Sequence, residues 1–185
     1  MIEEVMKDLQ ESLDKAIAAL RRELSKVRTG RAHPSILDRI RVDYYGVPTP
    51  ISQMATIAVP DARMLTVRPW ERTQVKAVEK AIRESDLGLN PQVDAELIRI
   101  PIPALTEERR KEMVKLTKRH GEEGKVAIRK HRRDALSMLS DLAKEGEVSE
   151  DQAERARKKA EDLIADKVKE VDRIVAEREG DIMAV

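Results

Sequence analysis

The sequence predicts an α+β protein: an elongated three-helix bundle interrupted by a small inserted α/β-type domain. All eight prolines and all three aromatic residues fall between Pro34 and Pro103, and the flanking stretches are proline-free and highly charged. Because proline breaks a helix interior, the flanks can form long helices and this window cannot. We therefore expect a helical body from residues 1–30 and 105–185, with a β/α/β domain inserted at residues 31–104.

Three helices are expected in the flanks. In residues 2–28, apolar side chains recur every three or four positions and form one stripe, and Gly30 follows as a stop. A second helix is expected at residues 107–144 after the N-cap Thr106, with an apolar seam formed by Met113, Leu116, Ala127, Ala135, Leu139 and Leu142. Ser149 and Gln152 have the spacing of a capping box and open a third helix with its own stripe. Three narrow stripes favour a bundle packed along one seam.

The inserted domain is expected to mix strands with one helix. Residues 36–45 end in an alternating apolar and polar pattern typical of a half-buried strand, and Gly46 and Pro48 indicate a turn. Further strands are expected at residues 55–59, 64–68 and 97–102. Residues 71–85 have helical spacing of their apolar side chains, which predicts a short helix between the strands.

The charge is distributed unevenly along the helical flanks. Residues 107–133 hold 11 Lys or Arg against 5 Asp or Glu, whereas residues 134–185 hold 9 against 15. Six cations follow helical spacing on the second helix, and we call them the basic stripe: Lys111, Lys115, Lys118, Lys125, Arg129 and Arg132. A line of cations on a rigid helix suits the phosphates of a nucleic acid, and it also suits a solvated helix face.

Other chemistry is not indicated. His120 and His131 stand about 16 Å apart along a helix, too far to share a metal ion, and Glu123 would give His120 only a second ligand. Gly121 to Lys125 lacks the glycine spacing of a phosphate loop, so close helix packing is the favoured role of these glycines. We expect no catalytic residues, no metal and no cofactor, and we expect Tyr44, Tyr45 and Trp70 to form a small core and its rim.

The sequence also bears on location and assembly. It has no cysteine, no apolar run of the roughly 18–20 residues that a membrane span needs, and no signal-like start. We expect a cytoplasmic protein that does not bind membranes. A monomer is favoured because the three stripes can satisfy one another.

Five motifs resemble the ribosome recycling factor family along the whole chain. They are SKVRTGRA at 25–32, VDYYGVPTP at 42–50, SDLGLNP at 85–91, LTEERRK at 105–111 and AIRKHRRD at 127–134. The resemblance implies a non-enzymatic translation factor that binds the post-termination bacterial ribosome and, with elongation factor G and GTP, splits it into subunits. It also implies that the bundle lies along large-subunit rRNA and that the GTPase pushes the inserted domain.

The resemblance points to particular residues. Arg132 is expected to make the main rRNA contact, together with Arg129, Arg133, Arg110, Arg28 and Arg31. A hinge is expected where the chain crosses between the domains, at Gly30, Arg31, Ala32, Pro103, Ala104 and Leu105. Four positions depart from the family pattern: Lys130 and His131 within the RNA-facing motif, Ala95 in place of a turn glycine, and Ala104 in place of a proline.

Two functions of other classes remain open from the sequence. A helical-hairpin chaperone, or a structural protein that binds nucleic acid, would use the same helices, although the expected hairpin tip around Gly146 is polar. An enzyme would need a site in the inserted domain, near Arg31, Asp43 and Tyr44.

Overall fold

The computed structural model describes residues 1–184, and the chain divides into two compact units. The helical unit comprises Met1–Thr29 and Glu107–Ala184, and the inserted unit comprises Gly30–Thr106. The predicted α+β class, with a helical bundle and an insert that contains strands, is confirmed.

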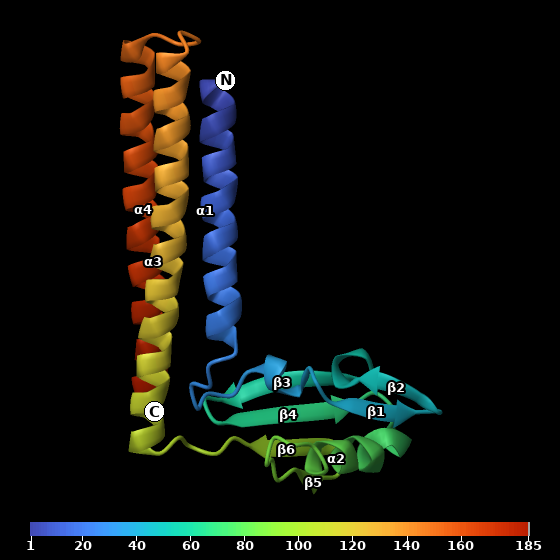
Figure 1. Ribbon diagram of the computed structural model, residues 1–185. Helices are drawn as coiled ribbons and strands as arrows, with labels where there is room; N and C mark the ends of the chain where they lie inside the picture. Colours follow the sequence, from blue (N-terminus) through green and yellow to red (C-terminus); the bar gives the residue numbers. More distant parts are fainter. Residues whose placement is uncertain (185) are drawn as a thin grey trace. The chain divides into compact units, whose positions relative to one another are not determined.

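The helical unit contains three long helices, which lie side by side (Figure 1). They are α1 (Ile2–Ser25), α3 (Glu107–Lys144) and α4 (Glu150–Met183), and each contacts the other two. Both ends of α3 agree with the prediction, and the capping box formed by Ser149 and Gln152 at the start of α4 is confirmed. Gly146 adopts a φ of +74° between α3 and α4, a conformation that glycine accepts without a steric penalty.

The helix α1 ends three residues before its predicted end. Val27 remains buried after the helix stops, and its carbonyl oxygen accepts a hydrogen bond of 2.7 Å from Nη2 of Arg178 on α4. Burial lowers the pKa of the Arg178 guanidinium. A tertiary contact therefore replaces the last helical turn that periodicity predicted.

The three predicted stripes form the bundle core. Leu9, Leu13, Ile17, Leu20 and Leu24 of α1 are buried, and α4 buries mainly alanine, valine and isoleucine. On α3 the seam differs from the prediction, because Leu116, Ala127 and Leu142 are only half-buried. Thr117, Gly121 and Ile128 are buried there instead. The Thr117 hydroxyl donates to the carbonyl oxygen of Met113 at 2.8 Å, which satisfies its polar group inside the core.

The inserted unit contains a hairpin, a four-stranded sheet and one helix. The hairpin pairs β1 (Arg41–Tyr44) with β2 (Val47–Pro50). The antiparallel sheet has the order β3-β4-β6-β5, formed by β3 (Ala55–Asp61), β4 (Met64–Pro69), β6 (Leu97–Pro101) and β5 (Gln92–Asp94). The helix α2 (Val75–Arg83) contacts β1, β4, β5 and β6. The core of this unit includes Val42, Leu65, Val78, Ile82 and Ile98.

Three details of the inserted unit differ from the prediction. Pro34–Leu37 forms a 3₁₀ helix that the sequence pattern did not predict. The strand β2 was missed because Pro48 and Pro50 lie within it. Among residues 1–184 it pairs with β1 alone, so no second strand there needs the missing N–H groups. The three-residue β5 was missed because it is too short to show a pattern.

Candidate RNA-binding surface

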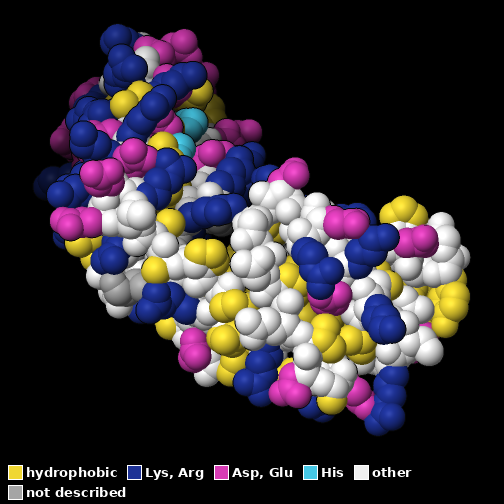
Figure 2. Space-filling model, turned by 90° about the horizontal axis from the view of Figure 1, so that it is seen from below, with side chains coloured by type: hydrophobic (Ala, Val, Ile, Leu, Met, Phe, Trp, Pro, Cys, Tyr) yellow, Lys and Arg dark blue, Asp and Glu magenta, His cyan; other side chains and the backbone are white. Residues whose placement is uncertain are grey.

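Three of the predicted arginines lie together near the middle of α3. Arg129, Arg132 and Arg133 follow one another within about one helical turn, and we call them the arginine cluster. Arg129 and Arg133 are separated by four residues, so they project from the same side of the helix. Figure 2 shows many Lys and Arg side chains over the helical unit, mixed with Asp and Glu.

Within the cluster, Arg132 is held by an acidic residue of α4. Its Nη2 lies 2.6 Å from Oε1 of Glu161, and its Nε lies 2.9 Å from Oε2. The hydrogen bonds from Arg132 lower the pKa of the Glu161 carboxyl, and Glu161 in turn raises the pKa of Arg132. Sequence reasoning missed Glu161, because the pairing depends on how α3 and α4 align and no local motif signals it.

The other two arginines of the cluster are exposed. Neither Arg129 nor Arg133 has a side-chain hydrogen bond or ion pair with the residues at 1–184. Their guanidinium groups therefore remain available for an external anion, and arginine offers a planar set of donors that matches a phosphate.

Other members of the basic stripe are partly neutralised. Lys125 lies 2.6 Å from a carboxylate oxygen of Asp172 on α4 and 3.8 Å from Glu122, and Lys111 lies 3.3 Å from Glu107. The stripe is therefore not a continuous row of free charge. Among residues 1–184, the stripe members without an ion pair are Lys115, Lys118 and Arg129.

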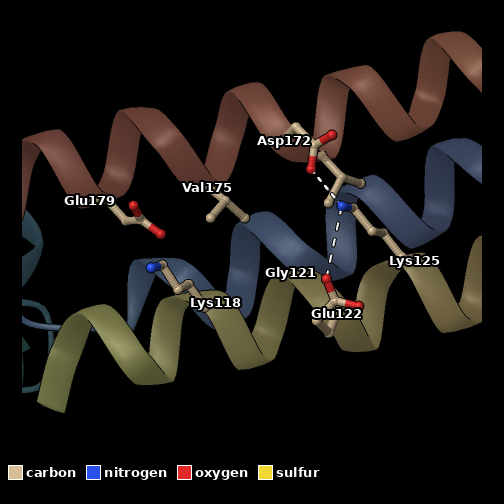
Figure 3. A pocket seen from close by; sticks show the side chains of 8 residues that line it. Lys118, Gly121, Glu122, Lys125, Asp172, Val175 and Glu179 are labelled. Carbon is tan, nitrogen blue, oxygen red and sulfur yellow. Dashed lines mark ion pairs between the residues drawn. The ribbon is translucent and has the colours of Figure 1, made fainter.

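A shallow groove of about 380 Å³ runs beside the basic stripe between α3 and α4. Figure 3 shows Lys118 and Glu179 pointing toward each other from the two helices, and Lys125 reaching Asp172. A Cβ atom at Gly121 would lie 2.6 Å from Cγ2 of Val175, which confirms the predicted close helix packing at this glycine. At Gly124 the nearest atom, Cδ2 of Leu20, would lie 3.7 Å away, so this glycine is not required sterically.

The remaining predicted arginines do not join the cluster on α3. Arg110 lies 22 residues before Arg132, about 33 Å along the helix axis. Leu20 packs against Gly124, so Arg28, eight residues further along the chain and exposed, lies toward the beginning of α3. Arg31 belongs to the inserted unit.

Among the predicted hinge residues, Gly30 has a positive φ, a backbone conformation that favours glycine. Gly30 has a φ of +76°, and a Cβ atom there would lie 3.4 Å from Cγ of Leu105, so the two chain crossings approach each other within the inserted unit. Ala32 N–H donates to the Ala62 carbonyl at 2.7 Å, and Ile102 N–H donates to the Arg63 carbonyl at 2.8 Å. These hydrogen bonds attach both chain crossings to the turn between β3 and β4. The sequence did not indicate this role of the turn.

The tyrosines and the tryptophan are more exposed than predicted. Tyr44 alone packs against the core of the inserted unit, whereas Tyr45 is 72% and Trp70 is 65% exposed. The hydroxyl groups of Tyr44 and Tyr45 donate to the two oxygens of Glu71, at 2.5 and 2.9 Å. These bonds lower the pKa of Glu71, and the carboxylate raises the pKa of Tyr44.

Residues 1–184 contain neither a metal-binding cluster of side chains nor a helix suited to cross a membrane. Nδ1 of His120 lies 3.3 Å from Glu123, and within residues 1–184 no group of three or more His, Cys, Asp and Glu side chains is placed to hold a metal ion. None of the helices in that part of the chain combines the length and apolar character that a membrane crossing requires. In the inserted unit, Asp43 accepts a hydrogen bond from Gly46 N–H at 2.8 Å and supports the hairpin turn.

These features define a class of protein: a three-helix bundle with exposed arginines along one helix, interrupted by a small α+β unit. The family model described as ribosome recycling factor matches residues 20–183, and the chain belongs to that family.

Relatives and solved structures agree with this assignment. A ribosome-recycling factor from Sorangium cellulosum (strain So ce56) is 65% identical over 185 residues, which cover 100% of both chains. One from Anaeromyxobacter dehalogenans (strain 2CP-C) is 50% identical and covers 99% of this chain and 97% of the relative. A solution structure of the ribosome recycling factor matches with a TM-score of 0.76 at 38% identity, covering 100% of this chain and 98% of the other.

A further structure places a relative in a larger assembly. It gives models for the T. thermophilus ribosome recycling factor and the E. coli elongation factor G bound to the E. coli post-termination complex. The recycling factor matches with a TM-score of 0.67 at 40% identity, and the match covers 99% of each chain.

Proposed function

We propose that this protein acts with elongation factor G and GTP to split post-termination bacterial ribosomes into subunits. The observation that carries the proposal is membership of the ribosome recycling factor family, supported by 65% identity to a relative over the full length of both chains. The structure of a relative with elongation factor G on a post-termination complex supports the choice of partners. The protein is then a translation factor of the bacterial cytoplasm that acts as a monomer.

The helical unit is proposed to bind large-subunit rRNA through the arginine cluster, with Arg110, Arg28 and Arg31 as further contacts. Exposure of Arg129 and Arg133 without protein partners supports this role. Contacts of this kind recognise phosphates and RNA shape and carry little base specificity.

The residues Gly30, Arg31, Ala32, Pro103, Ala104 and Leu105 are proposed to form a hinge between the two units. Two crossings restrict twisting, so the expected motion is hinge-like. The hydrogen bonds from Ala32 and Ile102 to the turn between β3 and β4 favour a narrower hinge, in which Gly30, Arg31 and residues 103–105 change conformation most.

The chain is proposed to supply binding and transmission of force, while elongation factor G supplies the energy of GTP. The nearest enzyme hypothesis placed a site at Arg31, Asp43 and Tyr44, but Asp43 supports a turn and Tyr44 is bonded to Glu71. The chaperone hypothesis needs an apolar hairpin tip, whereas residues 144–147 at the α3–α4 connection are polar or glycine and exposed.

The test is light scattering of post-termination bacterial ribosomes mixed with the protein, elongation factor G and GTP. We expect a fall in scattering that requires all three additions. Omission of GTP, or its replacement by a non-hydrolysable analogue, is the control. A folded protein that produces no fall with a compatible elongation factor G would contradict the proposal.

A further inference from the structure

The ion pair between Arg132 and Glu161 joins two helices through a specific geometry. Glu161 approaches the side of the guanidinium group that carries Nε and Nη2, at 2.9 and 2.6 Å. The two side chains come from α3 and α4 and are 43% and 44% exposed. The pair therefore lies at the surface of the helical unit, where an external ligand can reach it.

This geometry leaves one edge of Arg132 unused. A guanidinium group has five N–H donors, and the bonds to Glu161 occupy Nε–H and one hydrogen of Nη2. Nη1 makes no hydrogen bond to residues 1–184. In that part of the chain, Nε of Arg178 is the one buried side-chain nitrogen or oxygen atom that lacks a hydrogen bond. Because Nη1 of Arg132 also lacks a hydrogen bond and is not that atom, it is accessible to solvent. The edge formed by Nη1 and Nη2 can therefore hold a phosphate while Nε stays bonded to Glu161.

We propose that Glu161 is a positioning residue, which holds the Arg132 guanidinium so that its Nη1–Nη2 edge faces an RNA phosphate. This inference rests on the proposed function, in which Arg132 contacts rRNA. Fixing a long side chain before binding avoids part of the ordering cost that binding would otherwise include. No carboxylate contacts Arg129 or Arg133 in this way within the described residues, so Arg132 is the preorganised member of the cluster.

The proposal predicts an effect opposite in sign to simple electrostatics. Removing an acidic side chain near a polyanion site normally strengthens binding, because it removes repulsion. If Glu161 positions Arg132, Glu161→Ala should instead weaken binding of the full chain to large ribosomal subunits, by about threefold to tenfold. Asp162→Ala is the matched control, because Asp162 is exposed on the same helix and has no partner among residues 1–184.

Affinity for purified large ribosomal subunits should be measured by sedimentation over a series of KCl concentrations. Each lost phosphate contact reduces the slope of log affinity against log salt concentration by about 0.7–0.9. We expect Glu161→Ala to lower both the affinity and this slope, and Asp162→Ala to change neither or to tighten binding slightly. Glu161→Gln keeps an acceptor oxygen at the same reach, so it should restore part of the affinity.

A second set of variants separates the rRNA contact of Arg132 from the positioning role of Glu161. Arg132→Ala should lower affinity, and adding Glu161→Ala to it should cause no further loss, because Glu161 acts through Arg132. If Arg132→Ala binds like the parent protein, the proposed rRNA contact is wrong. If Arg132→Ala weakens binding while Glu161→Ala binds equally well or more tightly than the parent, the positioning role is wrong. Thermal melting followed by circular dichroism establishes folding, and Glu161→Gln carries the test if Glu161→Ala melts early.

Discussion

Gly121 and Val175 meet where α3 and α4 approach closely, and a Cβ atom at Gly121 would lie 2.6 Å from Cγ2 of Val175. Valine on a helix is confined largely to one rotamer, so its methyl group cannot move aside cheaply. The contact makes Gly121 necessary for packing. By contrast Gly124, one turn later, has space for a methyl group.

Alanine substitutions at these two glycines should have opposite effects. Gly121→Ala should destabilise the bundle by about 1–2 kcal/mol, because the overpacking cost exceeds the gain in helix propensity. Gly124→Ala should stabilise it by up to about 1 kcal/mol. Urea unfolding followed by circular dichroism at the helix band measures both. Equal effects of the two substitutions would contradict the assigned packing.

Ala95→Gly should stabilise the inserted unit. Ala95 has a φ of +57° in the turn between β5 and β6, in the left-handed region where an L-residue other than glycine is strained. Replacement by glycine should add about 0.5–1 kcal/mol after the greater entropy of the unfolded chain is included. The fluorescence of Trp70, the single tryptophan, reports unfolding of this unit. A loss of stability would show that the turn does not need a left-handed residue.

The stability of the inserted unit should decrease in acid through Glu71. Hydrogen bonds from Tyr44 and Tyr45 hold the pKa of Glu71 below its ordinary value of 4.5. A lowered carboxyl pKa stabilises the fold above 4.5, and this contribution disappears as the pH falls through the lowered value. Urea unfolding followed by Trp70 fluorescence should therefore show a decline in stability as the pH falls below 4.5, and this decline should be weaker in Glu71→Gln. The same decline in both proteins would contradict the role of Glu71.

Binding to ribosomes should depend on salt through the two exposed arginines. The double variant Arg129→Ala/Arg133→Ala should reduce the slope of log affinity against log salt by about 1.4–1.8 if each guanidinium neutralises one phosphate. Arg173→Ala is the matched control, because Arg173 is exposed on α4 outside the cluster. Sedimentation with large subunits measures the slopes. A single-charge control that lowers the slope by half as much as the double variant, or more, would indicate a diffuse charge effect.

The long helices could be predicted because their determinants are local. Apolar spacing defines α1, α3 and α4, and the Ser149–Gln152 capping box marks where α4 begins. The end of α1 could not be predicted, because it depends on a hydrogen bond from Arg178, 151 residues away in sequence. The strand β2 could not be predicted because it contains two prolines, which normally argue against a strand. They are tolerated because β2 lies in a two-stranded hairpin, which is a tertiary feature.

The candidate site likewise combines features that depend on local sequence with features that depend on tertiary contacts. The spacing of Arg129, Arg132 and Arg133 placed them near one another on α3, and their charge indicated a polyanion partner. Which of them is paired depends on the alignment of α3 with α4, and that alignment brings Glu161 to Arg132 and Asp172 to Lys125. No pattern within one helix contains that information.

The protein is proposed to split ribosomes by anchoring its helical unit to rRNA through the arginine cluster. The most direct measurement is the rate of the light-scattering fall with post-termination ribosomes, elongation factor G and GTP, for the parent protein, Arg132→Ala and the control Arg173→Ala. We predict that Arg132→Ala is folded but splits ribosomes at least about tenfold more slowly, a loss equivalent to about 1.4 kcal/mol, while Arg173→Ala resembles the parent. Equal rates for the parent and a folded Arg132→Ala would contradict the claim.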